Sequence, residues 1–119
     1  GMRYTKTQTA LEIGCGVGRM LRAASDIFGN VFGVDVSPLA VDKAKELLGV
    51  SSNIQVSANS GYDLNGIADA SIDFVWSFAA LAHMPARVLA AYLLEMKRVL
   101  CAYAHSLRPI LWTRYSSRG

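Results

Sequence analysis

Residues 10–18 read Ala-Leu-Glu-Ile-Gly-Cys-Gly-Val-Gly, and this stretch decides the fold of the chain. A short, mostly apolar run contains one acidic residue, Glu12, and glycines then follow at the alternate positions 14, 16 and 18. A helical pattern begins at Arg19. A strand, a glycine-rich turn and a helix in this order bring backbone N–H groups and a helix N-terminus against a ligand. Glycine suits such a turn because it tolerates positive φ and carries no Cβ that would hold a ligand away.

The composition is typical of a single globular domain. The chain has 119 residues, of which 52% are hydrophobic and 18% are charged, so we expect residues 1–119 to form one domain around one core. The net charge of +3 comes from 12 basic and 9 acidic residues that are dispersed along the chain. Because no basic stripe is present, no nucleic-acid partner is predicted.

Cysteine usage and hydropathy indicate the cellular compartment. The two cysteines, Cys15 and Cys101, do not make a disulfide framework, and a bridge at Cys15 would block the glycine turn. No apolar run approaches the ~20 residues of a membrane span, and residues 1–6 lack the apolar region of a signal peptide. We therefore predict a cytoplasmic protein with no membrane partner and no metal centre.

Strands and helices alternate along the sequence. Strands are predicted at 10–15, 31–36, 53–58 and 72–79, and helices at 19–28, 38–48 and 85–100. The third strand alternates apolar and polar residues, which favours an edge position, whereas the fourth is nearly all apolar, which favours a central one. A weaker pattern at 108–115 is compatible with a fifth strand.

This alternation predicts an α/β fold, a Rossmann-like, doubly wound and mostly parallel sheet with right-handed crossovers. Ligands of such sheets bind outside the carboxyl ends of the strands. The glycine turn follows the first strand, Asp35 closes the second, and polar residues follow the third and fourth. The sequence therefore predicts a ligand site at that edge of the sheet.

Two cofactor classes compete for the glycine turn. Dinucleotide-binding turns read G-x-G-x-x-G, but this chain reads G-x-G-x-G, with Arg19 at the position of the third glycine. Glu12 would repel a pyrophosphate and attract an ammonium group, while Asp35 can accept hydrogen bonds from both hydroxyls of a ribose. The pair suits a nucleoside with a cationic tail, and an NAD-dependent oxidoreductase is the less favoured alternative.

At these positions the sequence resembles the class I S-adenosylmethionine-dependent methyltransferases, in particular their small-molecule branch. The stretches that carry the resemblance, over about residues 10–100, are 11–18 for the first motif, 34–38 for the second, 71–77 for the fourth strand, and 82–85 with 95–100 for the segment that follows. The resemblance implies S-adenosylmethionine as the cofactor.

The resemblance also implies a role for individual residues. The glycines would wrap the cofactor, Glu12 would position its methionine part and Asp35 would bind its ribose. The remaining implied cofactor contacts are Gly14, Cys15, Gly16 and Gly18 in the turn, Val36, Asn59, Ser60, Gly61 and Tyr62 around the adenine, and Ser77 and Phe78 near the reactive methyl group. His83 is the candidate general base, and a loop histidine without a catalytic role is its alternative.

Methyl transfer requires few catalytic groups from the protein. Displacement at a sulfonium carbon releases a neutral group, so the enzyme mainly supplies alignment and, where the acceptor carries a proton, a base. The family's Asn-Pro-Pro-Tyr motif, which accompanies methylation of base amino groups in DNA, is replaced after the fourth strand by Ser77-Phe-Ala-Ala80. A small-molecule methyl acceptor is therefore predicted.

The last part of the sequence departs from the family pattern. Residues 101–119 form an atypical tail in place of a Pro-Gly-Gly turn and the strands that follow it, and only nine residues precede Ala10. We therefore expect an incomplete sheet of about five strands, without the last two family strands, in a truncated gene product. A cofactor-binding fragment without turnover is the second functional hypothesis, and an unpaired sheet edge predicts a homodimer that covers it.

Overall fold

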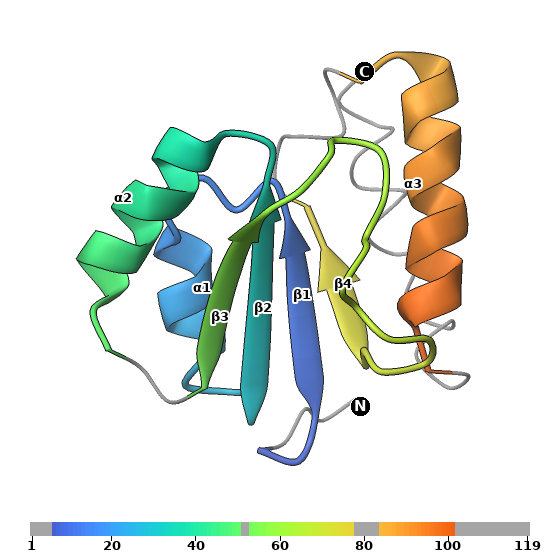
Figure 1. The fold of residues 1–119 in the computed structure, drawn as a ribbon. Coiled ribbons are helices and arrows are strands. Elements are labelled where there is room, and N and C mark those ends of the chain that lie inside the picture. Colours follow the sequence, from blue (N-terminus) through green and yellow to red (C-terminus); the bar gives the residue numbers. More distant parts are fainter. Residues whose placement is uncertain (1–5, 51–52, 78–83, 102–119) are drawn as a thin grey trace, which may run out of the picture.

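The computed structural model describes residues 6–50, 53–77 and 84–101 (Figure 1). The elements in chain order are β1 (Thr9–Ile13), α1 (Arg19–Ala24), β2 (Asn30–Asp35), α2 (Pro38–Leu48), β3 (Ile54–Ala58), β4 (Phe74–Trp76) and α3 (Ala86–Val99). This order confirms the predicted alternation. The tail beyond Cys101 and the weak pattern at 108–115 lie outside the described residues.

The strands form one parallel sheet in the order β3-β2-β1-β4. Glu12 of β1 lies beside Gly33 of β2 and beside Trp76 of β4, and Asp35 of β2 lies beside Ala58 of β3. Because every pairing is parallel, the carboxyl ends of all these strands meet at one edge, which is uppermost in Figure 1. The Rossmann-like topology predicted from the sequence is confirmed.

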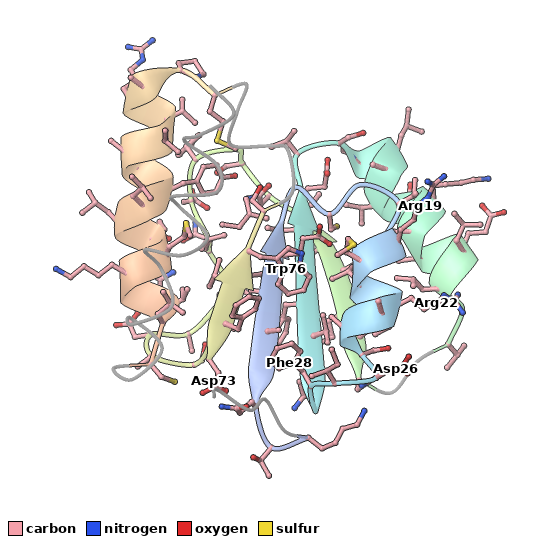
Figure 2. The ribbon with its side chains drawn as sticks, turned by 180° about the vertical axis from the view of Figure 1, so that it is seen from behind. Arg19, Arg22, Asp26, Phe28, Asp73 and Trp76 are labelled. Carbon is pink, nitrogen blue, oxygen red and sulfur yellow. The ribbon has the colours of Figure 1, made fainter. Side chains whose placement is uncertain are left out.

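Each face of the sheet carries its own apolar core, as a doubly wound fold requires. On one face, Leu11, Ile13 and Val34 pack with Tyr92 and the other buried residues of α3. On the opposite face, Ala10 and Val31 pack with buried residues of α1 and with Phe28. There Phe28, Phe74 and Trp76 stack in sequence with ring centroids 5.9 and 5.8 Å apart, and Figure 2 shows Phe28 and Trp76 on the side of the sheet that α1 covers.

Helix α2 begins and ends as its sequence predicts. The Ser37 hydroxyl accepts a hydrogen bond from the backbone N–H of Ala40 at 3.2 Å, and Pro38 occupies the first turn. The helix ends at Gly49, which has a φ of +66°.

Helix α1 is shorter than the predicted 19–28. It ends at Ala24, and residues 25–28 continue as turns that lead into the backbone bond from Gly29 N–H to the carbonyl of Gln8. Leu21, Ala24 and Phe28 are buried, whereas the apolar residues Met20 and Ile27 are 46% and 51% exposed. Ile27 is exposed because the helix ends before its period can bring that side chain round to the sheet, whereas Met20 is exposed within α1 itself.

The fourth strand differs from its prediction in length and position. It spans only Phe74–Trp76, and within the described residues it pairs with β1 alone, at the edge of the sheet rather than its centre. Asp73 still contacts the start of β1, because its backbone N–H donates to the carbonyl of Thr9 and its carboxylate accepts from Thr9 N–H, both at 2.8 Å. Ile72 bridges to Leu100 instead. The predicted edge position of the third strand is confirmed.

The segment between β3 and β4 is fastened to α3 by Arg98. Its guanidinium donates to the backbone carbonyls of Leu64 and Ile67 and to the carboxylates of Asp69 and Glu95. Glu95 in turn accepts from Leu64 N–H at 2.9 Å. The network therefore holds residues 64–69 of this segment against the last turns of α3. In the part of the chain that the structure describes, no helix has the length and apolarity needed to span a bilayer.

Candidate functional site

A pocket of about 320 Å³ opens at the carboxyl edge of the sheet. The ends of β1, β2 and β3 and the turns after them supply one side of it, with Ile13, Gly14, Asp35, Val36, Asn59 and Gly61. The start of α3 and the residues before it supply the other, with Met84, Pro85, Val88 and Tyr92. Five of these ten residues belong to the predicted cofactor contacts, so the structure brings together residues that are far apart in the sequence.

The glycine turn adopts the backbone conformation that its sequence predicts. Gly14, Gly16 and Gly18 have φ values of +75°, +55° and +89°, a region that other residues rarely enter. A Cβ at Gly16 would meet no atom within 4 Å, whereas one at Gly18 would lie 2.9 Å from Leu48 Cδ1. Gly16 therefore leaves space beside the turn, and Gly18 allows the turn to pack closely against α2.

Asp35 ties the glycine turn to the start of α2. Its Oδ2 accepts from Gly16 N–H at 2.9 Å and its Oδ1 accepts from Ser37 N–H at 3.0 Å. The helix-start role that would compete with ribose binding is thus present. A carboxylate has about four acceptor positions, so each oxygen keeps capacity for one hydroxyl of a ligand in the pocket.

Glu12 is a buried carboxylate with an unsatisfied atom. Its side chain is 2% exposed, and Oε1 accepts no hydrogen bond from the described residues. Burial raises the pKa of Glu12 to about 7; the neighbouring Trp76 indole acts in the opposite direction and the Asp35 carboxylate adds a smaller increase. A cationic group bound nearby would stabilise the ionised form of Glu12.

The loop after β3 also contributes to the pocket. The Ser60 hydroxyl accepts from the N–H groups of Tyr62 and Asp63, at 3.2 and 3.1 Å, and so shapes the loop. Gly61 has a φ of +94°, and a Cβ there would lie 3.0 Å from Val36 Cγ1. Val36 itself is 58% exposed, so an apolar side chain lies open at the pocket beside a glycine.

Several predicted contacts lie away from this pocket or outside the described residues. Cys15 packs on the opposite face of the sheet against Leu21 and Gly33, and burial, followed by the charges of Glu12 and Asp35, raises the pKa of its thiol to about 12. The other described residues predicted as contacts that do not line the pocket are Glu12, Gly16, Gly18, Ser60, Tyr62 and Ser77. Ser77 Oγ is buried without a partner among the described residues. Phe78 and His83 lie outside the described residues, and their roles stay predictions.

The sequence did not identify the contribution of α3 to the pocket. In the sequence, Tyr92 is one of several apolar or aromatic residues within the helix predicted at 85–100. Tyr92 is 1% exposed, and its hydroxyl accepts from Asn59 Nδ2 at 2.7 Å. A buried tyrosine needs a partner for its hydroxyl, which is the signal in the sequence that points to a polar contact there.

Comparison with known proteins identifies the family of this fold and site. The sequence model of a methyltransferase domain matches residues 11–104. The chain belongs to the class I S-adenosylmethionine-dependent methyltransferases. S-adenosylmethionine, the cofactor implied by the glycine turn, is the cofactor of this family.

Individual relatives are longer than this methyltransferase domain. This chain is 34% identical over 93 residues to the 2-methyl-6-phytyl-1,4-hydroquinone methyltransferase of Synechocystis. The matched region covers 77% of this chain and 28% of that protein. PH0226 from Pyrococcus horikoshii is 29% identical, with a TM-score of 0.71 over 82% of this chain and 47% of its own. YcgJ from Bacillus subtilis is 25% identical, with a TM-score of 0.72 over 82% and 42%.

A more distant structure shares the fold. The phosphoethanolamine N-methyltransferase 1 of Haemonchus contortus, solved in complex with phosphoethanolamine and S-adenosylhomocysteine, has a TM-score of 0.76 at 21% identity over 85% of this chain and 22% of its own. The chain spans less than half the length of each of these relatives.

Proposed function

We propose that the pocket at the carboxyl ends of β1, β2 and β3 binds S-adenosylmethionine for transfer of its methyl group to a small-molecule acceptor. The observation that carries this proposal is the convergence of Gly14, Asp35 and Asn59 on one pocket. These residues come from three different turns, and each has a chemistry that suits one part of an adenosine derivative with a cationic tail.

Each part of the cofactor has a matching group in the chain. The ammonium of the methionine part would pair with Glu12, whose buried carboxylate has no partner for Oε1 among the described residues. The ribose hydroxyls would donate to Asp35, and the adenine ring would lie against Val36 beside Gly61. Backbone N–H groups of the glycine turn and the side chains of Ser60, Tyr62, Ser77 and Phe78 complete the proposed contacts.

The chain's own residues mainly hold and align the reactants. S-adenosylmethionine supplies an electrophilic methyl group on a positively charged sulfur. Alignment of an acceptor atom with that carbon lowers the barrier without a catalytic acid. We propose His83 as the base that removes a proton from an acceptor, and retain a non-catalytic loop histidine as its alternative.

A small acceptor is supported by sequence and by relatives. The names of the relatives specify a hydroquinone for the Synechocystis protein and phosphoethanolamine for the Haemonchus protein. The apolar residues Met84, Pro85 and Val88 line the same pocket. Since this chain covers only 28% of the Synechocystis relative, cofactor binding without turnover is the second function to be tested.

Location and assembly complete the proposal. Within the described residues both Cys15 and Cys101 are free thiols, which supports a reducing, cytoplasmic location. The free edge of β4 in the described sheet supports a homodimer that covers it.

The test is a calorimetric titration with S-adenosylhomocysteine and, separately, with NAD. We expect one molecule of S-adenosylhomocysteine to bind per chain and NAD not to bind. Asp35→Ala should weaken binding by about 1–3 kcal/mol, because ribose hydroxyls and Gly16 N–H lose their acceptor. Asp42→Ala, at an exposed position of α2, is the matched control and should bind normally. Binding of NAD alone would refute the proposal.

A further inference from the structure

Two buried polar groups lie side by side in the sheet, and neither has a hydrogen-bond partner among the described residues. Glu12 of β1 and Trp76 of β4 are register neighbours. Register neighbours in a parallel pair share a face of the sheet, and Trp76 packs on the face that α1 covers (Figure 2). The atoms without partners are Oε1 of Glu12 and Nε1 of Trp76.

The chemistry of the two groups is complementary when Glu12 is ionised. An indole N–H can only donate a hydrogen bond, and a carboxylate can only accept one. A bond between them is charge-assisted and stronger than one to a neutral carboxyl group. The indole already lowers the pKa of Glu12, although the opposing effect of burial is larger. Ionised Glu12 is therefore the acceptor that the buried N–H of Trp76 needs.

The packing of Trp76 limits where its N–H can point. The indole stacks on Phe74, with ring centroids 5.8 Å apart and an angle of 30° between the ring planes. Phe74 stacks in turn on Phe28, with centroids 5.9 Å apart. A ring that is packed in this way has little freedom to turn toward a different acceptor. Its nitrogen is thus held beside the Glu12 carboxyl.

The other neighbours of Glu12 give its ionised form no comparable support. Of the interactions that shift the pKa of Glu12, only that with the indole favours the carboxylate, whereas Asp35 of β2 favours the protonated form. Cys15 packs on the same face, and its thiol, with a pKa of about 12, is neutral near pH 7. On α1 the buried residues are apolar and Arg19 and Arg22 are exposed, and β4 has no charged residue.

We propose that Trp76 is a positioning residue that acts through Glu12: when Glu12 is ionised, its Oε1 accepts a hydrogen bond from Trp76 Nε1, and this bond holds the carboxylate for the ammonium group of the ligand. The consequence for binding rests on the proposed cofactor function. Trp76 does not line the pocket, so it affects the ligand only through the carboxylate. As a cationic ligand binds, the proton of Glu12 passes to solvent and the indole N–H gains its acceptor.

The first test needs no ligand and follows the indole N–H signal of Trp76 by NMR from about pH 5 to about pH 8.5, a range that spans the ionisation of Glu12. The signal is assigned by its absence from Trp76→Phe. Because a carboxylate is the stronger acceptor, the indole proton should move downfield as Glu12 ionises, with a midpoint near pH 7. In Glu12→Gln, which cannot ionise, the signal should not move.

The second test measures the affinity for S-adenosylhomocysteine against pH by calorimetry. Loss of the indole donor makes Glu12 harder to ionise, so Trp76→Phe should bind about tenfold more weakly than the wild-type chain at about pH 6. At about pH 8.5 Glu12 is largely ionised in both proteins before the ligand binds, and the two affinities should agree to within about twofold.

Two matched proteins separate the hydrogen bond from the packing of the ring. Phe74→Leu disturbs the same stack but keeps the indole N–H, so any loss of affinity should be equal at both pH values. In a Trp112→Phe chain Trp76 is the one tryptophan left, and its replacement by benzothienylalanine keeps the ring shape and removes only the N–H. That protein should reproduce the pH-dependent loss, and it decides the inference if Trp76→Phe does not fold.

Three results would overturn the inference while leaving the proposed function intact. They are an indole signal that does not move with pH, one that moves equally in Glu12→Gln, and a loss of affinity in Trp76→Phe that is the same at both pH values. Failure of the wild-type chain to bind S-adenosylhomocysteine at any pH would instead refute the proposed function, and the indole titration would still decide whether Trp76 and Glu12 form the bond.

Discussion

Glu12 shows how a single buried group can link ligand binding to pH. It lies on a strand between Gly33 and Trp76, where it is almost fully buried and no described residue hydrogen-bonds its Oε1. Burying a carboxylate without partners costs free energy, and the protein lowers that cost by binding a proton. A cationic ligand would remove the need for the proton.

We predict that Glu12 makes the free domain less stable as the pH rises. Its pKa is raised from 4.5 to about 7 in the folded state, so the folded chain holds a proton that the unfolded chain has released. The contribution of this proton to the free energy of unfolding is fully present below pH 4.5 and is lost as the pH rises to about 7. The loss is at most about 3 kcal/mol. Chemical unfolding from pH 5 to 8 should show this loss in the wild-type chain and not in Glu12→Gln.

The same carboxylate should make ligand binding depend on pH in the opposite sense. Because the ammonium of S-adenosylhomocysteine favours ionised Glu12, affinity should increase between pH 6 and pH 8 in the wild-type chain. Glu12→Gln should show a weaker dependence. Identical pH profiles for the two proteins would show that Glu12 does not contact the cationic part of the ligand.

One feature of the fold concerns a contact between two elements. The close packing of α1 on the sheet depends on Gly33. A Cβ at this position would lie 2.5 Å from Leu21 Cδ1 and 3.0 Å from Cys15 Sγ. Gly33 therefore allows the short helix α1, with only six residues, to lie directly on β2.

We predict that Gly33→Ala destabilises the domain by about 1–3 kcal/mol, the usual cost of overpacking a core. Leu21→Val removes the Cδ1 atom that the new methyl group would meet. The double variant should therefore be more stable than the sum of the two single effects implies. Strictly additive losses in chemical unfolding would show that this contact does not set the distance between α1 and β2.

Some elements were predictable from sequence because their signals are local. The glycine turn, the Ser37 cap and the ends of α2 depend on backbone conformations that only a few residue types favour, and the structure has all of them. The site residues Gly14, Asp35 and Val36 follow from their positions at strand ends, and the structure places them at the pocket.

Other elements could not be predicted because their signals are not local. The apolar sequence of 72–79 indicates burial on both faces of the sheet, but it does not indicate how many strands lie beside it. The predicted central position was therefore wrong for the described sheet, in which β4 lies at an edge. The direction of the Cys15 side chain, which packs in the core beneath α1 and not at the pocket, depends on the exact path of the turn. The contact of Asn59 with Tyr92 depends on how α3 is rotated against the sheet.

At the scale of the whole molecule, the domain assembles one pocket from three successive strand ends and one later helix. Arg98 and Glu95 hold the connecting loop against α3, so both walls are attached to the same core. A second pocket of about 310 Å³ lies between α2 and β3, lined among others by Lys45 and Gln55. The account assigns the cofactor to the first pocket and not to the second.

The most direct test of that assignment is a titration of ¹⁵N-labelled protein with S-adenosylhomocysteine, followed by the chemical shifts of backbone amides. The account predicts the largest changes at Gly14, Gly16, Val36, Asn59 and Gly61, and little change at Lys45 and Gln55. Changes concentrated at Lys45 and Gln55, or no saturable change at the first group of amides, would contradict it.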